Sequence, residues 1–434
     1  MSSASISHAT PAALLRASFD AALAAAAPGR ILSSYLPSPP RGRVLAVGAG
    51  KAAASMAAAL EAAWPEVRLD GLVITRYGHL VPTRRIQVVE AGHPVPDEAG
   101  ALAADEILRR ARELGPDDLL LALVSGGGSS LLALPVAEVT MADLKAVTQA
   151  LLASGAPIEQ MNVVRKHLSR LAGGQLAAAA AARGARVCAL IVSDVTGDAP
   201  SDIASGPCAP DPSTYADAIA VLARWGVVAP ASVRSHLERG ARGAVAETPK
   251  PGDAFFAAVD NRVIASARQS LVAAADVFRV AGVRPVILGD TVTGEAREVA
   301  KVYAALVREI RTTGAPFAPP VALISGGECT VTLPAGVRGR GGRCSEFLLS
   351  LAVELGTEGI HAIACDTDGI DGSEANAGAI LDPQSVERAR ARGVAARTAL
   401  ERHDAWGFFA ASDGLVETGP TLTNVNDYRA LLVV

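Results

Sequence analysis

The sequence lacks several features that mark particular classes of protein. Aromatic residues make up only 4% of the 434 residues although half are hydrophobic, so the apolar content comes mainly from alanine and small aliphatic side chains. Lysine and arginine total 40 against 44 acidic residues, which gives a net charge of -4. This balance provides no broad basic field for nucleic acid or an anionic membrane, so small molecules are the expected partners.

Cysteine is scarce and irregularly spaced. The five cysteines are Cys188, Cys208, Cys329, Cys344 and Cys365. Their number is odd and no CxxC pair occurs, which argues against both a disulfide framework and a zinc site. This usage fits a reducing cytoplasm.

The chain also lacks the run of roughly 20 uncharged apolar residues that a membrane-crossing helix requires. The first apolar stretch, residues 11–28, is interrupted by Arg16 and Asp20. It is predicted to be an amphipathic surface helix and not a signal peptide. We expect a soluble, cytoplasmic protein.

What the chain does contain is a repeated βα pattern. Short β-rich runs end in glycine or polar residues and are mostly followed by alanine-rich helical stretches. These runs are residues 43–47, 71–75, 119–124, 187–192, 284–288, 321–324 and 360–364. The pattern predicts an α/β fold with mostly parallel, buried strands.

The length of the chain favours two or three domains. Residues 226–252 contain no clear strand and are rich in Ala, Gly, Pro and charged residues, which makes them the best linker candidate. We therefore expect one α/β domain over residues 1–240 and a second over residues 255–434. The proline-rich stretch 312–320 is an alternative boundary.

Gly48 and Gly50 separate the first buried strand from a helical stretch and are followed by Lys51. Exposed amides and the helix dipole at such a turn favour a phosphate or a carboxylate, and Lys51 adds a full charge. The turn is not a Walker A loop, but it matches the looser GxGxxA dinucleotide fingerprint. The acid expected after the next strand is missing, since Arg76 stands there. A plain glycine turn with a solvated lysine is the alternative.

A second glycine-rich turn follows residues 119–124. It consists of Ser125, Gly126, Gly127, Gly128 and Ser129. Its consecutive amides and hydroxyls could form a nest for phosphate. The motif recurs in outline as Ser325, Gly326, Gly327 and Glu328. This recurrence suggests two related halves, and its acid could take a magnesium ion or a substrate hydroxyl, or merely solvate the turn.

Carboxylates gather after two of the predicted strands. Asp194 and Asp198 follow one strand, whereas Asp366, Asp368 and Asp371 follow another. Open α/β sheets place their sites at such strand ends. Phosphoryl transfer needs oxygen ligands for Mg²⁺ and a carboxylate that orients the attacking hydroxyl. Calcium-like or purely solvated turns are the alternative.

Arg343 follows two glycines and precedes a helical run, where its guanidinium could clamp a phosphate or a carboxylate. The neighbouring Cys344 is as consistent with packing as with a nucleophile. Asn162 and Arg165 lie on another predicted helix together with Lys166, which could simply face solvent.

Taken together, these motifs resemble the glycerate 2-kinase family, whose C-terminal region is called MOFRL. The resemblance spans nearly the whole chain. It is carried by residues 47–51, 92–97, 125–129, 162–169, 193–198, 203–207, 211–214, 325–328, 341–343, 366–372 and 418–425. The sequence departs from the family at Cys344-Ser345, where Asn-Gln is expected, and at Cys208, where threonine is expected.

The resemblance implies two Rossmann-like domains with mostly parallel sheets and an active-site cleft between them. It implies phosphorylation of D-glycerate at the 2-hydroxyl by ATP, giving 2-phosphoglycerate and ADP, with Lys51 and Arg343 as the leading catalytic residues. We expect Asp194 to orient the hydroxyl and Asp366, Asp368 and Glu328 to hold Mg²⁺, although these acids could exchange roles. The glycine turns are expected to bind the nucleotide.

Two other functions stay open. Members of this family have also been labelled hydroxypyruvate reductases, and an NAD(P)H-dependent reductase is the alternative that the GxGxxA match supports. A non-catalytic sugar-acid sensor is a third. A homodimer is compatible with the sequence.

Overall fold

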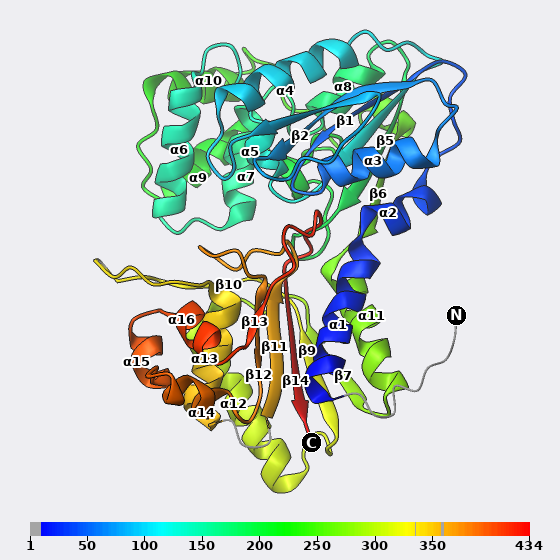
Figure 1. Ribbon diagram of the computed structural model, residues 1–434. Coiled ribbons are helices and arrows are strands. Elements are labelled where there is room, and N and C mark those ends of the chain that lie inside the picture. The colour runs from blue at the N-terminus through cyan, green and yellow to red at the C-terminus, as the bar shows by residue number, and fades with distance from the viewer. Residues whose placement is uncertain (1–9, 335, 357–359) are drawn as a thin grey trace. The chain divides into compact units, whose positions relative to one another are not determined.

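The computed structural model describes residues 10–334, 336–356 and 360–434. The chain divides into two compact units (Figure 1). We call residues 28–264 the N-terminal unit, and residues up to 27 together with 265–434 the C-terminal unit. Each unit has an α/β fold, which confirms the predicted fold class.

The N-terminal unit contains a six-stranded sheet in the order β3-β2-β1-β4-β5-β6. The strands are β1 (Val44–Ala49), β2 (Leu69–Arg76), β3 (Ile86–Ala91), β4 (Leu119–Val124), β5 (Arg186–Val192) and β6 (Val259–Ala265). The pairings that join β3, β2, β1, β4 and β5 are all parallel. This order places the topological switch point between β1 and β4, where doubly wound sheets bind ligands.

Two groups of helices accompany this sheet. Those beside it are α2 (Pro28–Ile31), α3 (Ala53–Ala63), α4 (Glu98–Ala111), α5 (Gly128–Leu131) and α8 (Gln175–Ala181). A separate hydrophobic cluster is formed largely by α6 (Met141–Ala153), α7 (Ile158–His167), α9 (Tyr215–Arg224) and α10 (Ala231–Ala241). Short 3-10 turns cover Leu32–Tyr35, Ile203–Ser205 and Ala254–Ala258. The second cluster supports α7 from its apolar face.

The sheet of the C-terminal unit has the order β13-β12-β11-β14-β9-β7. Its strands are β7 (Arg284–Gly289), β9 (Val321–Ser325), β11 (Ile360–Asp366), β12 (Gly378–Leu381), β13 (Leu415–Val416) and β14 (Asp427–Val433). Within the described residues of this six-stranded sheet, β7 and β9 pair in parallel and the other four pairings are antiparallel. The prediction of a mostly parallel sheet is therefore wrong for this unit. Two strands run opposite to both of their neighbours: β14 lies between β9 and β11, and β12 lies between β11 and β13.

The remaining elements of the C-terminal unit cover this sheet or extend it. The helices are α11 (Ala267–Val280), α12 (Ala296–Thr313), α13 (Arg343–Leu355), α14 (Ser385–Ala391), α15 (Ala396–Glu401) and α16 (Ala405–Ala411). Two short strands, β8 (Gly294–Glu295) and β10 (Cys329–Thr330), pair with each other. Helix α13 is buried along much of its length.

Helix α1 (Pro11–Ala26) stands at the start of the chain but belongs to the C-terminal unit. It is amphipathic, as predicted, and its buried face includes Phe19. This face packs against α11, and the Phe19 ring lies 5.8 Å from the ring of Tyr428 (Figure 1). The packing places α1 differently from the expected domains, residues 1–240 and 255–434, because helical periodicity does not say which distant surface covers an apolar face.

The five cysteines are all buried and unpaired. Burial raises the pKa of Cys208 to about 12, so its thiol stays protonated. Among the described residues, no helix is long and apolar enough to cross a membrane.

Candidate functional site

The turns after β1 and β4 lie side by side because these strands are neighbours in the sheet. The backbone N–H of Lys51 donates to the carbonyl of Gly126 (2.9 Å), and the N–H of Ala52 donates to Ser125 Oγ (3.0 Å). The structure therefore brings both predicted glycine turns together at the switch point.

The close approach of these two turns requires glycine. Gly48 has φ +151°, and a Cβ atom added to it would lie 1.9 Å from the carbonyl oxygen of Leu123. Gly50 has φ +140°, and its Cβ would lie 2.1 Å from Ser125 Oγ. Gly48 lies in β1 and Leu123 in β4, so a side chain at Gly48 would separate the two strands, whereas one at Gly50 would separate the two turns.

The turn after β4 offers hydrogen-bond donors to a ligand. Gly128 N–H donates to the carbonyl of Ser125 at 3.2 Å. In the part of the chain that the structure describes, the N–H groups of Gly126 and Gly127 make no hydrogen bond, and Gly126 is buried. Two successive free amides of this kind form a concave donor site for an anion.

Ser129 extends this site toward α7. Its Oγ lies 2.8 Å from Ser205 Oγ, and the Ser205 hydroxyl donates to Asn162 Oδ1 at 3.1 Å. Ala204 and Ser205 have φ of +51° and +58°, in the left-handed region that non-glycine residues rarely adopt. The surrounding contacts must hold this strained turn in place, and strain of this kind is common at binding sites.

Asp194 lies two residues beyond the end of β5 and is partly buried. Because β5 is parallel to β4, Asp194 stands at the same edge of the sheet as the two glycine turns. Asp198 follows in the same loop with φ +53°. Asp194 and Asp198 thus follow the end of β5, as the sequence predicted.

In the C-terminal unit, Arg343 is the first residue of α13 and forms three ion pairs. Its Nε donates to Asp427 Oδ1 (2.8 Å), its Nη2 donates to Asp366 Oδ2 (2.7 Å), and its Nη1 lies 2.8 Å from Glu328 Oε1. Burial by itself lowers the pKa of Arg343, but the carboxylates of Asp427, Asp366 and Glu328 outweigh it and raise this pKa. The guanidinium is therefore always charged and held in one position.

Asp427 and Arg429 are candidates that the motif analysis missed. Both lie in β14 and are at most 1% exposed. Arg429 Nη2 donates to Asp427 Oδ2 at 2.5 Å while the other oxygen of Asp427 accepts from Arg343. A signal was present in the sequence, because opposite charges two residues apart interrupt an otherwise apolar run at the chain end.

The carboxylates expected to hold magnesium have other partners. Asp366 and Glu328 both pair with Arg343, and Asp366 Oδ1 also accepts from the N–H of Asp368 (3.0 Å). Over residues 10–334, 336–356 and 360–434, no group of three His, Cys, Asp or Glu side chains could hold a metal ion. These residues do not form a ready magnesium site.

The turn after β9 resembles the turn after β4 in sequence but not in its bonding. Ser325 Oγ accepts from the hydroxyl of Tyr303 at 2.7 Å and is fully buried. Gly326 N–H donates to the carbonyl of Gly289 (2.8 Å), and the carbonyl of Gly326 accepts from Arg429 (3.2 Å). This turn therefore lacks the pair of free amides seen at Gly126 and Gly127.

Asp371 caps α13 and does not face a ligand. Its carboxylate accepts from the N–H groups of Cys344 (2.9 Å) and Ser345 (2.8 Å) and from Ser345 Oγ (2.6 Å). Burial raises the pKa of Asp371, although the contacts with Ser345 and Cys344 oppose this rise. Burial also raises the pKa of the Cys344 thiol well above its usual value, so Cys344 is a packing residue. The departure from the family at Cys344-Ser345 thus lies in a helix cap.

Two protein-family models match the chain. A domain of unknown function, DUF4147, matches residues 14–238, and the MOFRL family matches residues 321–427. The first match covers more than half of the chain, and together they extend over both units.

Similar proteins carry two kinds of name. A protein of Agrobacterium vitis, provisionally named a hydroxypyruvate reductase, is 53% identical over 97% of this chain and 94% of its own. A glycerate 2-kinase of Pyrococcus horikoshii is 41% identical over 91% of this chain and 88% of its own. The crystal structure of a glycerate kinase from Thermotoga maritima, 36% identical, superimposes with a TM-score of 0.85 and covers 97% of this chain and 99% of that one. The chain therefore belongs to the family of DUF4147 and MOFRL proteins that includes these glycerate kinases.

Proposed function

We propose that this protein transfers the γ-phosphate of ATP to the 2-hydroxyl of D-glycerate and so forms 2-phosphoglycerate and ADP. The observation that carries this proposal is the pair of free amides at Gly126 and Gly127, next to Lys51 at the switch point of a doubly wound sheet. The similarity over most of the chain to glycerate kinases of Pyrococcus horikoshii and Thermotoga maritima supports the choice of substrate.

In the N-terminal unit, we assign the nucleotide phosphates to the two glycine turns. Gly48 and Gly50 allow the chain to approach closely, and Ser125 through Ser129 supply amides and hydroxyls. The Lys51 ammonium would stabilise charge on the transferring phosphoryl group. Asp194 would orient the 2-hydroxyl of the substrate from the end of β5.

In the C-terminal unit, we assign Arg343 to the substrate carboxylate or to the transferring phosphoryl group. Its three carboxylate partners hold the guanidinium in place, and a substrate anion would compete with Glu328, which is the most exposed of the three. Ser325, Gly326 and Gly327 would then hold the end of β9 beside Arg429 and Asp427. This role does not depend on a contact with the nucleotide.

Magnesium would enter together with the nucleotide. Mg²⁺ keeps several waters and is commonly bound through substrate phosphates with only one or two protein carboxylates. This mode needs no preformed cluster of acids, which agrees with the ion pairs that Asp366 and Glu328 make with Arg343. Asp368 is the third carboxylate expected near the metal.

A hydroxypyruvate reductase is the second candidate, since relatives with that name share about half of their residues with this chain. The strand β2 ends at Arg76, where a dinucleotide-binding fold uses an acid to bind the ribose hydroxyl. Asp70 lies at the start of the same strand, beside Arg43 at 3.6 Å. These positions favour the kinase.

Phosphorus NMR of the protein with MgATP and D-glycerate tests the proposal, because one spectrum reports both transfer and the hydroxyl that receives the phosphate. A 2-phosphoglycerate signal is expected. A 3-phosphoglycerate signal would keep the kinase but reject the assigned hydroxyl. Absence of any ester, together with NADH oxidation in the presence of hydroxypyruvate, would replace the kinase with the reductase.

A further inference from the structure

We infer that Arg165 on α7 binds an oxyanion of a substrate, either a phosphate of the nucleotide or the carboxylate of the hydroxy acid. The identity of these ligands rests on the proposed function. The binding role itself rests on the charges of α7 and on the hydrogen bonds that join this helix to the turn after β4.

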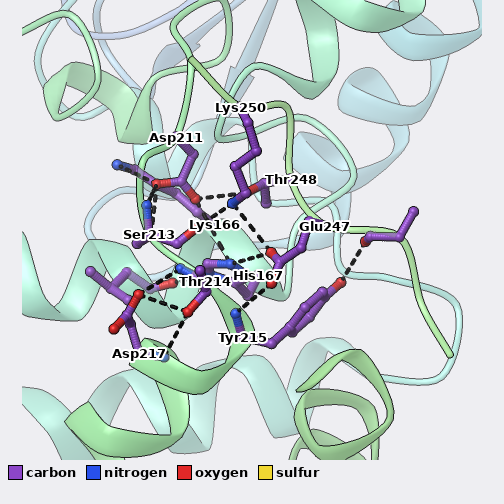
Figure 2. Close-up of polar contacts among 12 residues, drawn as sticks. Lys166, His167, Asp211, Ser213, Thr214, Tyr215, Asp217, Glu247, Thr248 and Lys250 are labelled. Carbon is purple, nitrogen blue, oxygen red and sulfur yellow. Dashed lines mark hydrogen bonds and ion pairs between the residues drawn. The ribbon is translucent and has the colours of Figure 1, made fainter. Parts of the chain in front are cut away.

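Three consecutive residues at the end of α7, Arg165, Lys166 and His167, can carry a positive charge. Two of them, Lys166 and His167, lie beside acidic partners (Figure 2). The Lys166 ammonium lies 3.6 Å from Asp211 Oδ1 and 3.8 Å from Asp202 Oδ1. The imidazole of His167 lies 3.2 Å from Glu247 Oε2. These two residues are therefore compensated within the N-terminal unit.

The charge of Lys166 is neutralised without a direct hydrogen bond to a carboxylate. Asp211 is fully buried, and its oxygens accept from Ser213 Oγ (2.7 Å), Ser213 N–H (3.1 Å) and Thr248 Oγ1 (2.9 Å). Figure 2 shows Asp211 surrounded by these donors and by Lys166. The network fixes Asp211 next to the lysine, so Lys166 is not the free cation of this helix.

Arg165 differs from both neighbours. Throughout the described ranges of the chain, its side chain makes no hydrogen bond and no ion pair, although it is only partly exposed. Burial lowers the pKa of its guanidinium, which means that the surroundings disfavour its charge. An arginine remains charged at neutral pH, so an unpaired and partly buried guanidinium costs free energy that a bound anion would recover.

The second observation is what lies beside Arg165 on the helix. Residues three apart are neighbours on a helical surface, so Arg165 is adjacent to Asn162. Asn162 accepts from Ser205, which contacts Ser129 at the end of the glycine turn. Asn162 and Ser205 therefore connect α7 to the turn whose free amides would bind an anion. Arg165 lies on the same part of α7 as Asn162.

A purely structural role is the alternative. The aliphatic part of an arginine side chain can cover apolar surface while its head group meets solvent. In that case removal of the charge would leave ligand binding unchanged, whereas removal of the stem would lower stability. The two roles can be separated by keeping the stem and removing the charge.

The test uses the full chain and calorimetric titration with MgATP alone and with D-glycerate alone, so that no turnover occurs. Arg165→Met keeps an unbranched apolar stem, and Arg165→Lys restores the charge. Arg224→Met is the matched control, because Arg224 is an exposed arginine of α9 in the same unit. We expect Arg165→Met to weaken the binding of one ligand at least ten-fold, with partial recovery in Arg165→Lys and no change in Arg224→Met.

The ligand that is weakened identifies the source of the oxyanion. The thermal midpoint of the ligand-free Arg165→Met protein should equal or exceed that of the unchanged protein, because an unfavourable charge has been removed. Unchanged affinity for both ligands would overturn the inference, as would a loss of binding matched in Arg224→Met. If the protein binds MgATP but forms no phosphoglycerate, the proposed reaction fails while the result for Arg165 still stands.

Discussion

At the scale of single residues, Asp427 is the link between the exposed and the buried parts of the C-terminal site. It accepts from Arg343, which is partly exposed, and from Arg429, which is fully buried. Replacing Asp427 with asparagine keeps the shape but removes the charge that both arginines need. Breaking a buried pair from one side typically costs about 3–5 kcal/mol, since it leaves an uncompensated charge.

We therefore expect Asp427→Asn to lower both stability and turnover. Loss of the position of Arg343 should reduce kcat/KM about 100-fold, the scale expected for a displaced catalytic group. Urea unfolding and steady-state kinetics measure the two effects. Asp413→Asn is the control, because Asp413 makes an exposed pair with Arg392 and should change neither quantity appreciably.

Gly50 gives a second prediction at this scale. Alanine at this position would place its Cβ 2.1 Å from Ser125 Oγ and 2.5 Å from the carbonyl oxygen of Ser125, at a φ of +140°. We expect Gly50→Ala to cost about 1–3 kcal/mol through overpacking and to weaken MgATP binding, because the two glycine turns must separate. Gly29→Ala is the control, since no atom lies within 4 Å of its added Cβ. Equal MgATP affinity in both variants would contradict the assignment of the turn.

At the scale of elements, Asp211 connects the segment that contains Thr248 to Lys166 in α7. Burial opposes the ionisation of Asp211, but Ser213, Lys166 and His167 outweigh it and lower its pKa below the ordinary 3.8. A lowered pKa in the folded state adds stability that is present above the unfolded value and is lost as the pH falls through the folded value.

The unfolding free energy should therefore decrease as the pH falls below about 4. Asp211→Asn should be less stable than the unchanged protein at neutral pH, and the two curves should converge in acid. Urea unfolding across this pH range measures the difference. Asp117→Asn is the control, because Asp117 is exposed in the same unit, and its unfolding free energy should follow that of the unchanged protein at every pH. If Asp117→Asn gave the same difference at neutral pH and the same convergence in acid, the effect could not be assigned to Asp211.

Helix α1 depends on contacts far away in the sequence. Phe19, on α1, is fully buried against α11 and Tyr428. Phe19→Ala should therefore lower the free energy of unfolding by about 3–5 kcal/mol. Val302→Ala serves as the control, because Val302 is 68% exposed on α12. Urea unfolding of both variants measures this cost. Equal urea midpoints for Phe19→Ala and Val302→Ala would mean that α1 contributes little to the stability of the C-terminal unit.

The same elements show how far the sequence could predict the fold. Apolar runs ending in glycine or polar residues predicted β1, β4 and β5, and the glycine turns after β1 and β4 were predicted with them, since both signals are local. The direction of β14 and the partner of α1 depend on contacts between segments that lie far apart in the sequence, and no local pattern encodes them. At the site, the glycines before Arg343 made it a candidate from the sequence. The charges of Asp427 and Arg429 stand out in an apolar run, but their contact with Arg343 follows from the strand order, which places β14 between β9 and β11.

At the scale of the whole molecule, the two units have different relations to the chain. The N-terminal unit is continuous and contains its own sheet and helical clusters, whereas the C-terminal unit needs both ends of the chain. Without α1, the apolar faces of α11 and of β14 would be exposed, since Leu271, Phe278 and Tyr428 share one buried cluster with Phe19. Exposed apolar surface of this kind leads to aggregation.

We therefore expect a fragment of residues 28–264 to unfold cooperatively when produced alone, and a fragment of residues 265–434 to aggregate or melt without cooperativity. Adding a peptide of residues 10–27 should restore a cooperative transition to the second fragment, because it returns the buried face of α1 together with Thr423 Oγ1, which donates to the carbonyl of Ala26 at 2.8 Å. A peptide with Phe19→Ala is the matched control and should fail to rescue. Circular dichroism during heating distinguishes these outcomes, and a cooperative transition of residues 265–434 without any peptide would show that α1 covers the unit but does not complete its core.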